Sequence, residues 1–434
     1  MTRRVVITGI GLVSPLGNSA SKLWDALAQE KTGIAELTTI PTSSLPTPFG
    51  AEAREFTGAI EEFGPLEKAL GRNIKKNLKV MCREIQMGVA VAQLCISDAG
   101  LKLESIDRDR LGVLYGSDYM LTLPGDFAGG VRKCLDGQGH FDFTKWADEG
   151  LPVVEPLWLL KYLPNLPAAH VAIFNELRGP NNSLTSREAS SNLAVSEAYH
   201  TILRGHADRM LAGATGTRIH PARSVHVAMQ ETLAEGSDPN KLSRPFDRNR
   251  NGQVLGEGAA CILLEELASA EARGAKILGE IIGGGSSIVA NTKSEPDEKT
   301  AIANVMNQSL NSAKLKPSEI GHIHAHGLSD VRGDKLEAQG IAAVLGSDTA
   351  KVPVTAAKSY FGNLGAAGGL VEAITSILAL QNGSLFPIQS LTELDPECPI
   401  RPAKRGDAAG DTCINLSVTP QGQASAIVIR KWAS

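Results

Sequence analysis

Aromatic residues are scarce in this chain of 434 residues, because phenylalanine, tryptophan and tyrosine together make up only 4%. Glycine, by contrast, occurs 44 times, and hydrophobic residues reach 42%. The core must therefore be built from aliphatic and small side chains, which favours close packing of helices on sheets. The length allows one large domain or two domains of ordinary size.

The chain also lacks a large excess of charge of one sign, because 43 Lys and Arg residues nearly balance 47 Asp and Glu residues, for a net charge of −4. The sequence therefore gives no electrostatic case for nucleic acid or an anionic membrane as a partner. No apolar stretch approaches the length of a membrane span, and the apolar run near the N-terminus is short and broken by glycine, unlike a signal peptide. We expect a cytoplasmic protein.

Paired cysteines are lacking as well, because the six cysteines are widely spaced and form no CxxC pattern. Free thiols in a reducing compartment are expected rather than disulfides. His322, His324 and His326 alternate along a predicted strand, so they share one face and a metal site is conceivable. No cysteine or carboxylate follows at ligand spacing, since Asp330 and Asp334 lie beyond the strand. We therefore predict no metal.

Predicted strands and helices alternate along the chain, which indicates a layered α/β architecture. Strands are predicted at residues 5–9, 111–117, 276–285, 320–327 and 424–430. Helices are predicted at residues 20–31, 77–99, 300–314 and 368–381. Residues 35–75 are proline-rich and irregular, and residues 118–160 are expected to form a lid or cap.

Glu188 occupies a position whose neighbours favour a reactive nucleophile. A turn into a short strand precedes it, and residues 193–198 favour a helix, so it lies near a strand-to-helix elbow beside free N–H groups. Such an elbow suits a nucleophile, because backbone amides stabilise an anion. A carboxylate is a poor nucleophile toward a thioester. Three roles stay open: a helix-start carboxylate, a stand-in for a bound anion in an oxyanion hole, and direct chemistry.

Segments spread over nearly the whole chain resemble the β-ketoacyl synthases, the condensing enzymes of fatty-acid and polyketide synthesis. Residues 5–17 resemble the family's first strand and turn, and residues 170–180 resemble the segment before its nucleophile. Residues 243–259, SRPFDRNRNGQVLGEGA, are close to a family fingerprint and are the most specific match. Residues 358–359 and 365–368 match another motif.

The resemblance implies a thiolase fold, which has five layers, αβαβα, built from two related halves. We assign these halves to residues 1–265 and 266–434 of one compact unit. The resemblance also implies a ketosynthase-type dimer, with an identical chain or with a cysteine-bearing ketosynthase. It further implies an acyl carrier protein that delivers acyl chains on phosphopantetheine, and no cofactor of the chain's own.

Carried onto this sequence, the family's catalytic residues are only partly kept. The family uses a cysteine nucleophile, two histidines, a lysine and an oxyanion hole. The cysteine position falls on Glu188, the first histidine on His326, the second on Asn363 and the lysine on Lys358. We expect Lys358 to order the pocket. Losing an activated nucleophile costs about 10^4–10^6 in rate, so the chain's own condensing activity is expected to be lost.

The family's gate loop near the C-terminus is also altered. The resemblance places the glycine-phenylalanine gate on residues 415–422, where both phenylalanines are replaced, Ser417 and Thr419 are the gate positions, and Pro420 follows. A residue before proline is pushed to extended geometry, so we expect this loop to be stiff.

Three functions follow from this pattern. The leading hypothesis is a nucleophile-less partner of an active ketosynthase, similar to the chain-length-factor subunits of ketosynthase heterodimers, with residues 181–185 as the central interface strand. The second is a malonyl-carrier-protein decarboxylase that makes primers, which His326 favours and Asn363 disfavours. The third is a divergent active 3-oxoacyl synthase or acyltransferase with another nucleophile, for which Cys413 is one candidate.

Overall fold

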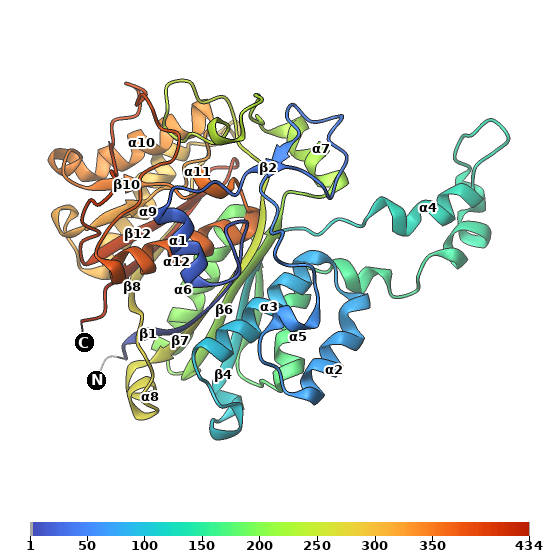
Figure 1. The fold of residues 1–434 in the computed structure, drawn as a ribbon, viewed down its shortest axis with the longest axis horizontal. Helices are drawn as coiled ribbons and strands as arrows, with labels where there is room; N and C mark the ends of the chain where they lie inside the picture. Colours follow the sequence, from blue (N-terminus) through green and yellow to red (C-terminus); the bar gives the residue numbers. More distant parts are fainter. Residues whose placement is uncertain (1–2, 434) are drawn as a thin grey trace.

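A mixed sheet of 11 strands runs through the protein in the order β11-β10-β9-β12-β13-β8-β1-β7-β6-β4-β5 (Figure 1). The structure is a computed structural model and describes residues 3–433. The strands of this sheet are β1 (Val5–Val13), β4 (Leu111–Ser117), β5 (Asn181–Thr185), β6 (Arg209–Thr217), β7 (Glu257–Glu266), β8 (Gly279–Ile288), β9 (His322–His324), β10 (Pro353–Thr355), β11 (Arg401–Pro402), β12 (Thr412–Val418) and β13 (Gln423–Arg430). A separate small sheet pairs β2 (Ala35–Glu36) with β3 (Phe49–Gly50).

The strand order repeats between two halves of the chain. The first half has the order β5-β4-β6-β7-β1, and the second has the order β10-β9-β12-β13-β8. In both halves the first two pairings are parallel and the next two are antiparallel. The halves meet where β1 pairs with β8. The topology thus contains a repeat that the sequence does not show, while the boundary between residues 265 and 266 stays a prediction.

Helices form three layers around the two half-sheets. The helices are α1 (Ala20–Ala28), α2 (Lys68–Asn77), α3 (Arg83–Asp98), α4 (Pro124–Lys133), α5 (Leu166–Asn175), α6 (Ser190–Leu203), α7 (Pro221–Gln230), α8 (Leu267–Ala272), α9 (Glu298–Ala313), α10 (Val331–Leu345), α11 (Lys358–Phe361) and α12 (Gly368–Asn382). Helices α6 and α12 contact strands of both halves, α3 and α5 cover the first half-sheet, and α9 with α10 covers the second. This confirms the predicted αβαβα thiolase fold.

The middle layer needs helices that are buried on every side and residues small enough for close approach. In α12, every residue from Gly368 to Leu380 is buried, which matches its apolar composition. Where β4 passes α6, a Cβ atom on Gly116 would lie 2.7 Å from the carbonyl carbon of Ser190, so only glycine fits there. Within residues 3–433, no helix combines the length and the apolar character needed to cross a membrane.

The first strand is longer than predicted, and glycine is the reason. The strand was predicted to end at Gly9, but β1 continues to Val13. Gly9 and Gly11 mark the crossing of α3, because a Cβ atom on Gly11 would lie only 1.8 Å from the carbonyl oxygen of Val91. These glycines therefore allow a close helix-on-strand contact and do not make a turn.

The predicted lid over residues 118–160 is wrong. Most of this segment projects from the body as an arm, which we define as residues 121–163 (Figure 1). None of the described residues that line the cavity beside His326 belongs to the arm. The arm has its own small aromatic cluster, in which Phe127 contacts Trp146 and Trp158 at ring-centroid distances of 6.1 and 4.8 Å. This packing links the parts of the arm to one another, and Trp158 and Tyr162 also pack against the core of the body.

Candidate active site

Glu188 lies in the predicted strand-to-helix turn, between the end of β5 at Thr185 and the start of α6 at Ser190. The backbone of Arg187 has a positive φ of 51°, which makes the chain turn sharply. The Ser190 hydroxyl accepts a bond from the Ser186 N–H at 2.7 Å. The turn places the Glu188 side chain inside the protein, where it is 2% exposed.

Glu188 belongs to a closed ring of five hydrogen-bonded side chains. Arg218 Nη2 donates to Glu188 Oε1, and Arg218 Nη1 donates to Glu231 Oε1 at 3.4 Å. Gln253 Nε2 donates to Glu231 Oε2 at 2.6 Å. Asn363 Nδ2 donates to Gln253 Oε1 at 2.7 Å and to Glu188 Oε1 at 3.3 Å, which closes the ring. We call these residues the five-residue ring.

Charges in and beside the ring balance. Arg187 contacts both glutamates, through Nη2 to Glu231 Oε1 and through Nε to Glu188 Oε2 at 3.5 Å, so two guanidinium groups face two carboxylates. Burial lowers the pKa of Arg218 to about 10, which leaves it charged at neutral pH. Burial opposes ionisation of Glu231, but the charges of Arg218 and Arg187 prevail and lower its pKa. Neighbouring charges thus stabilise this buried cluster.

The suggested role of Glu188 as an anion stand-in bound by backbone amides is not what the structure shows. Within residues 3–433, no backbone N–H donates to its carboxylate. Instead, Oε1 accepts from Arg218 and Asn363, and Oε2 lies 3.5 Å from Arg187 Nε. A guanidinium offers a charge-assisted bond, which is stronger than a bond from a neutral amide. Glu188 is therefore an ion-pair partner.

His326 and Lys358 are in direct contact with each other. Lys358 Nζ donates to His326 Nδ1 at 3.1 Å and to the His326 carbonyl oxygen at 2.8 Å, and it also contacts Glu372. Because a lysine ammonium only donates, His326 Nδ1 accepts and Nε2 carries the proton. Burial, followed by the charge of Lys358, places the pKa of His326 well below its usual value, so the imidazole is neutral.

Two carboxylates on α10 hold the loop after His326, and the sequence did not point to them as site residues. Glu337 accepts from the backbone N–H groups of His326 and Gly327 at 2.6 and 2.8 Å. Asp334 accepts from those of Leu328 and Phe246 at 2.9 and 2.8 Å. Burial raises the pKa of Glu337 to about 8 and that of Asp334 to about 7. Their spacing of three residues on one helix was the available signal.

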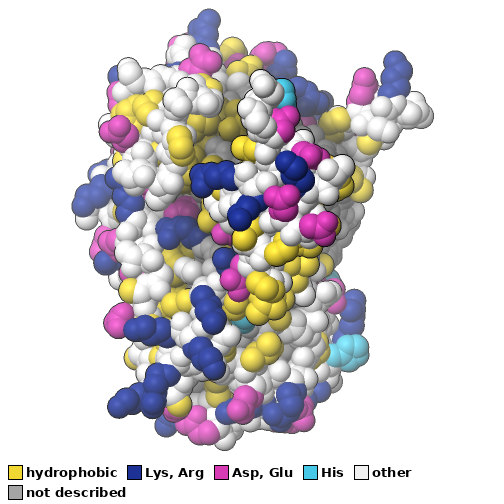
Figure 2. Space-filling model, turned by 90° about the vertical axis from the view of Figure 1, so that its right-hand side faces the viewer, with side chains coloured by type: hydrophobic (Ala, Val, Ile, Leu, Met, Phe, Trp, Pro, Cys, Tyr) yellow, Lys and Arg dark blue, Asp and Glu magenta, His cyan; other side chains and the backbone are white. Residues whose placement is uncertain are grey.

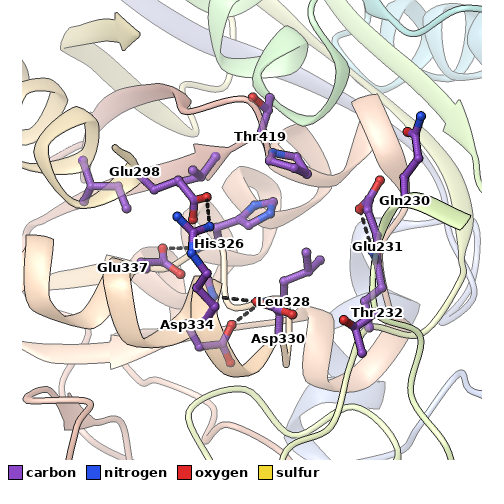
Figure 3. Close-up of a pocket in the computed structure, with 16 residues that line it drawn as sticks. Gln230, Glu231, Thr232, Glu298, His326, Leu328, Asp330, Asp334, Glu337 and Thr419 are labelled. Carbon is purple, nitrogen blue, oxygen red and sulfur yellow. Dashed lines mark hydrogen bonds and ion pairs between the residues drawn. The ribbon is translucent and has the colours of Figure 1, made fainter. Parts of the chain in front are cut away.

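A cavity of about 370 Å³ opens beside His326 (Figure 3). Its wall includes His326, Thr419, Glu231 and Gln253, and Figure 3 shows Glu231 across the cavity from His326. Three of the predicted site residues do not line this cavity, namely Glu188, Lys358 and Asn363. The complete lining is Gln230, Glu231, Thr232, Gln253, Glu298, Ile302, His326, Leu328, Asp330, Arg332, Gly333, Asp334, Glu337, Val418, Thr419 and Pro420. The cavity therefore ends at the five-residue ring.

The gate loop is a short turn closed by its own hydrogen bonds. Thr419 N–H donates to the Gln423 carbonyl oxygen at 2.8 Å, and Gly422 N–H donates to the Thr419 carbonyl oxygen at 3.0 Å. Thr419 faces the cavity, whereas Ser417 is buried and accepts from Asn192 Nδ2 at 3.3 Å. The two gate positions thus face different surroundings, and neither side chain has the bulk of a phenylalanine.

The other candidate groups have structural partners. His322 Nδ1 lies 2.8 Å from the Ala409 carbonyl oxygen, and His324 Nε2 accepts from the Ala357 N–H at 3.3 Å. In the described part of the chain, no three His, Cys, Asp or Glu side chains converge as metal ligands would. Cys413 is buried, and burial raises the pKa of its thiol to about 12, which disfavours the nucleophilic thiolate.

A doubly repeated α/β half-sheet with a layer of helices between the halves, a strand-to-helix elbow at Glu188 and a contacting pair of His326 and Lys358 defines a thiolase-fold protein. Residues 2–270 match the profile of the β-ketoacyl synthase N-terminal domain, and residues 278–392 match that of the C-terminal domain. The chain therefore belongs to the β-ketoacyl synthase family.

Named relatives and solved structures agree with this assignment. The chain is 33% identical to 3-oxoacyl-(acyl-carrier-protein) synthase 2 of Coxiella burnetii, over 92% of this chain and 91% of that protein. It is 33% identical to the chloroplastic synthase I of Arabidopsis thaliana, over 91% and 79% of the two chains. A β-ketoacyl synthase from Burkholderia phymatum superposes with a TM-score of 0.84 at 29% identity, covering 99% and 100% of the chains. The ishigamide ketosynthase/chain length factor has the same fold, with a TM-score of 0.84, 24% identity and full coverage of both chains.

Proposed function

We propose that this chain is a β-ketoacyl synthase homologue without a nucleophile of its own, which acts as the chain-length-factor-like partner of an active ketosynthase. The observation that carries the proposal is the state of Glu188. It occupies the turn where the resemblance places the nucleophile, yet its carboxylate is buried and paired with Arg218. A paired carboxylate is a poor nucleophile toward a thioester.

The second histidine position supports the same conclusion. Asn363 uses its side-chain amide to bridge Glu188 and Gln253, and its Oδ1 accepts from the Gly365 N–H at 2.9 Å. Its polar atoms are thus occupied within the protein, and it does not line the cavity. Of the two histidine positions, only the one that holds His326 lines the cavity. Losses within one catalytic unit are not additive, so repairing a single position would leave condensation impaired.

An exposed sheet edge and the arm support a dimer with a ketosynthase-type chain. Strand β5 ends the 11-stranded sheet, and three of its five residues are exposed. Of 15 strongly exposed large hydrophobic residues in the described chain, 10 lie on the arm: Leu123, Val131, Leu135, Phe141, Phe143, Leu151, Val153, Leu157, Leu159 and Leu160. Figure 2 shows apolar side chains on the face from which the arm projects. An unpaired edge beside an apolar patch fits a protein partner that continues the sheet.

A basic helix supports an acyl carrier protein as the second partner. Five exposed cations lie on and just after α2, and within residues 3–433 none of them forms an ion pair: Lys68, Arg72, Lys75, Lys76 and Lys79. Such a surface attracts an acidic protein. One structure with this fold is described as an acyl-carrier protein in complex with its ketosynthase. The carrier would present the acyl chain on phosphopantetheine.

Co-expression tests the partnership. The chain is expressed with a cysteine-bearing ketosynthase from the same genome, the complex is purified through a tag on one chain, and elongation is measured with acyl and malonyl carrier proteins. We expect copurification, elongation by the complex and none by this chain alone. Elongation by this chain alone, at the rate of the complex, would rule the proposal out.

Decarboxylation of malonyl-carrier protein is the second candidate function. The observation that favours it is the neutral His326, whose Nε2–H adjoins the cavity and can bond a thioester carbonyl as the enolate forms. Carbon dioxide release by the pure chain, abolished in the His326→Ala variant, would support this function. If the wild-type chain releases carbon dioxide no faster than the variant, the candidate is excluded.

A further inference from the structure

We infer that Arg218 is the residue that closes the elbow position of this chain to its own cavity, so that replacing Glu188 alone does not reopen it. The inference rests on the proposed function and adds a residue that determines what the pocket can admit. It follows from three observations on the five-residue ring.

The first observation is where the cavity ends. Glu231 and Gln253 line its wall, whereas Arg218, Glu188 and Asn363 do not. Arg218 bonds Glu231 on one side and Glu188 on the other. A molecule that entered the cavity would therefore meet the Glu231–Arg218 pair before it reached residue 188.

The second observation is the bulk of Arg218. Its side chain is 1% exposed and is among the largest fully buried side chains of the described chain. It extends from the end of β6, where its backbone N–H donates to the Gly256 carbonyl oxygen at 2.8 Å. On another side, an ideal Cβ atom on Gly365 would lie 3.6 Å from Arg218 Nε. The guanidinium therefore fills the space between the cavity wall and the elbow.

The third observation is that Arg218 cannot easily move aside. Both of its Nη atoms are paired with carboxylates, while its Nε has no hydrogen-bond partner among residues 3–433. Displacing it by an acyl chain would leave Glu188 and Glu231 as buried carboxylates without their principal counter-ion, which is strongly unfavourable. An apolar chain offers no compensating bond. The ion pairs therefore hold Arg218 in place, and the size of its side chain closes the path to residue 188.

A thiol introduced at position 188 makes this closure measurable. We compare Glu188→Cys, Glu188→Cys with Arg218→Ala, and Glu188→Cys with Arg223→Ala in the full-length chain. Arg223 is the matched control, because it is also 1% exposed but bonds Asp118 and the Thr217 carbonyl oxygen outside the ring. Each protein is treated with iodoacetamide, whose iodide the thiolate displaces while the thiol proton goes to solvent. Mass spectrometry of the peptide containing residue 188 gives the rate of labelling.

We expect slow labelling in the single variant and in the Arg223→Ala control, and labelling at least about tenfold faster when Arg218 is removed, since a buried thiol reacts only through local opening. Fast labelling of Glu188→Cys alone, or equal rates with Arg218→Ala and Arg223→Ala, would overturn the inference. If the alanine variant does not melt cooperatively, Arg218→Ser replaces it, because serine removes nearly the same bulk but leaves a polar hydroxyl at this position. No partner protein takes part, so failure here is distinct from failure to copurify.

Discussion

The guanidinium of Arg218 and the carboxylate of Glu188 form an ion pair in which both side chains are almost completely buried, at 1% and 2% exposed. The pair occupies the elbow where the family resemblance places a cysteine nucleophile. Glu231 and Arg187 complete a balanced group of four charges around it. The backbone at the elbow turns from β5 into α6, while the Glu188 side chain forms a buried ion pair.

Removing one partner of this pair is expected to destabilise the fold. Glu188→Ala leaves Arg218 and Arg187 with an excess of buried positive charge, which costs about 3–5 kcal/mol for a buried pair. Urea unfolding measures the change. The control is Glu197→Ala on the same helix, whose partly exposed side chain pairs with Arg204, and its effect should stay within about 0.5 kcal/mol. Equal stabilities for the two variants would contradict the account of the ring.

Glu337 is expected to make stability fall as the pH rises. Its pKa is about 8 in the folded protein against an ordinary value of about 4.5, so between these values the folded state holds a proton that the unfolded chain has released. The stabilisation is therefore present below about pH 4.5 and is lost as the pH approaches about 8, with a slope of up to about 1.4 kcal/mol per pH unit.

The comparison of wild type with Glu337→Gln isolates this group, because glutamine does not titrate. The difference in unfolding free energy between the two proteins should decrease from about pH 5 to about pH 8, in the direction given by linkage. Glu197→Gln serves as the control and should show a flat difference. A flat difference for Glu337→Gln as well would show that Glu337 is already ionised at pH 5.

The arm is expected to hold the partner chain. Leu157→Asp with Leu159→Asp places two charges on side chains that are 53% and 50% exposed, so the monomer should fold normally while association is lost. Copurification and light scattering measure the association. Ile288→Asp is the control, because Ile288 is 68% exposed but lies on β8, away from the arm. Unchanged association in the arm variant would exclude the arm from the interface.

The basic surface of α2 is expected to set the affinity for a carrier protein. Lys75→Glu with Lys76→Glu reverses two exposed charges, and binding should weaken and become less sensitive to salt. Lys241→Glu provides the control, since Lys241 is also exposed but lies beside Asp238 on another surface. Surface plasmon resonance at two salt concentrations separates the two variants, and equal losses would indicate a general charge effect.

The sequence predicted the elements that have a long and regular pattern. Strand β4 and helix α12 were located within one or two residues, because an apolar run and a helical repeat are local signals. The projecting arm was mistaken for a lid, since no local pattern tells whether a segment folds back onto the body or away from it. The two related halves were predicted only through the family resemblance, because the repeat depends on strand order and is not visible in the residues themselves.

The site was predicted only in part, for a related reason. Glu188, His326 and Lys358 were found through motifs; the structure brings Lys358 into contact with His326 at the cavity and places Glu188 in the five-residue ring. Arg218 and Glu231 were missed, because they come from the end of β6 and from just after α7, with no fixed spacing from Glu188. One signal was available: a single arginine at position 218 follows a run of small residues at the end of a buried strand. Buried charges of this kind need partners.

Intact-mass spectrometry of the pure chain tests the central claim most directly. The chain is incubated with an acyl-loaded carrier protein, its mass is recorded, and malonyl-carrier protein is then added to detect a β-ketoacyl product. We predict an unchanged mass and no elongated product, because the carboxylate at the elbow is held by Arg218 and does not attack the thioester. A stoichiometric acyl adduct on this chain, on any residue, followed by elongation would contradict the account.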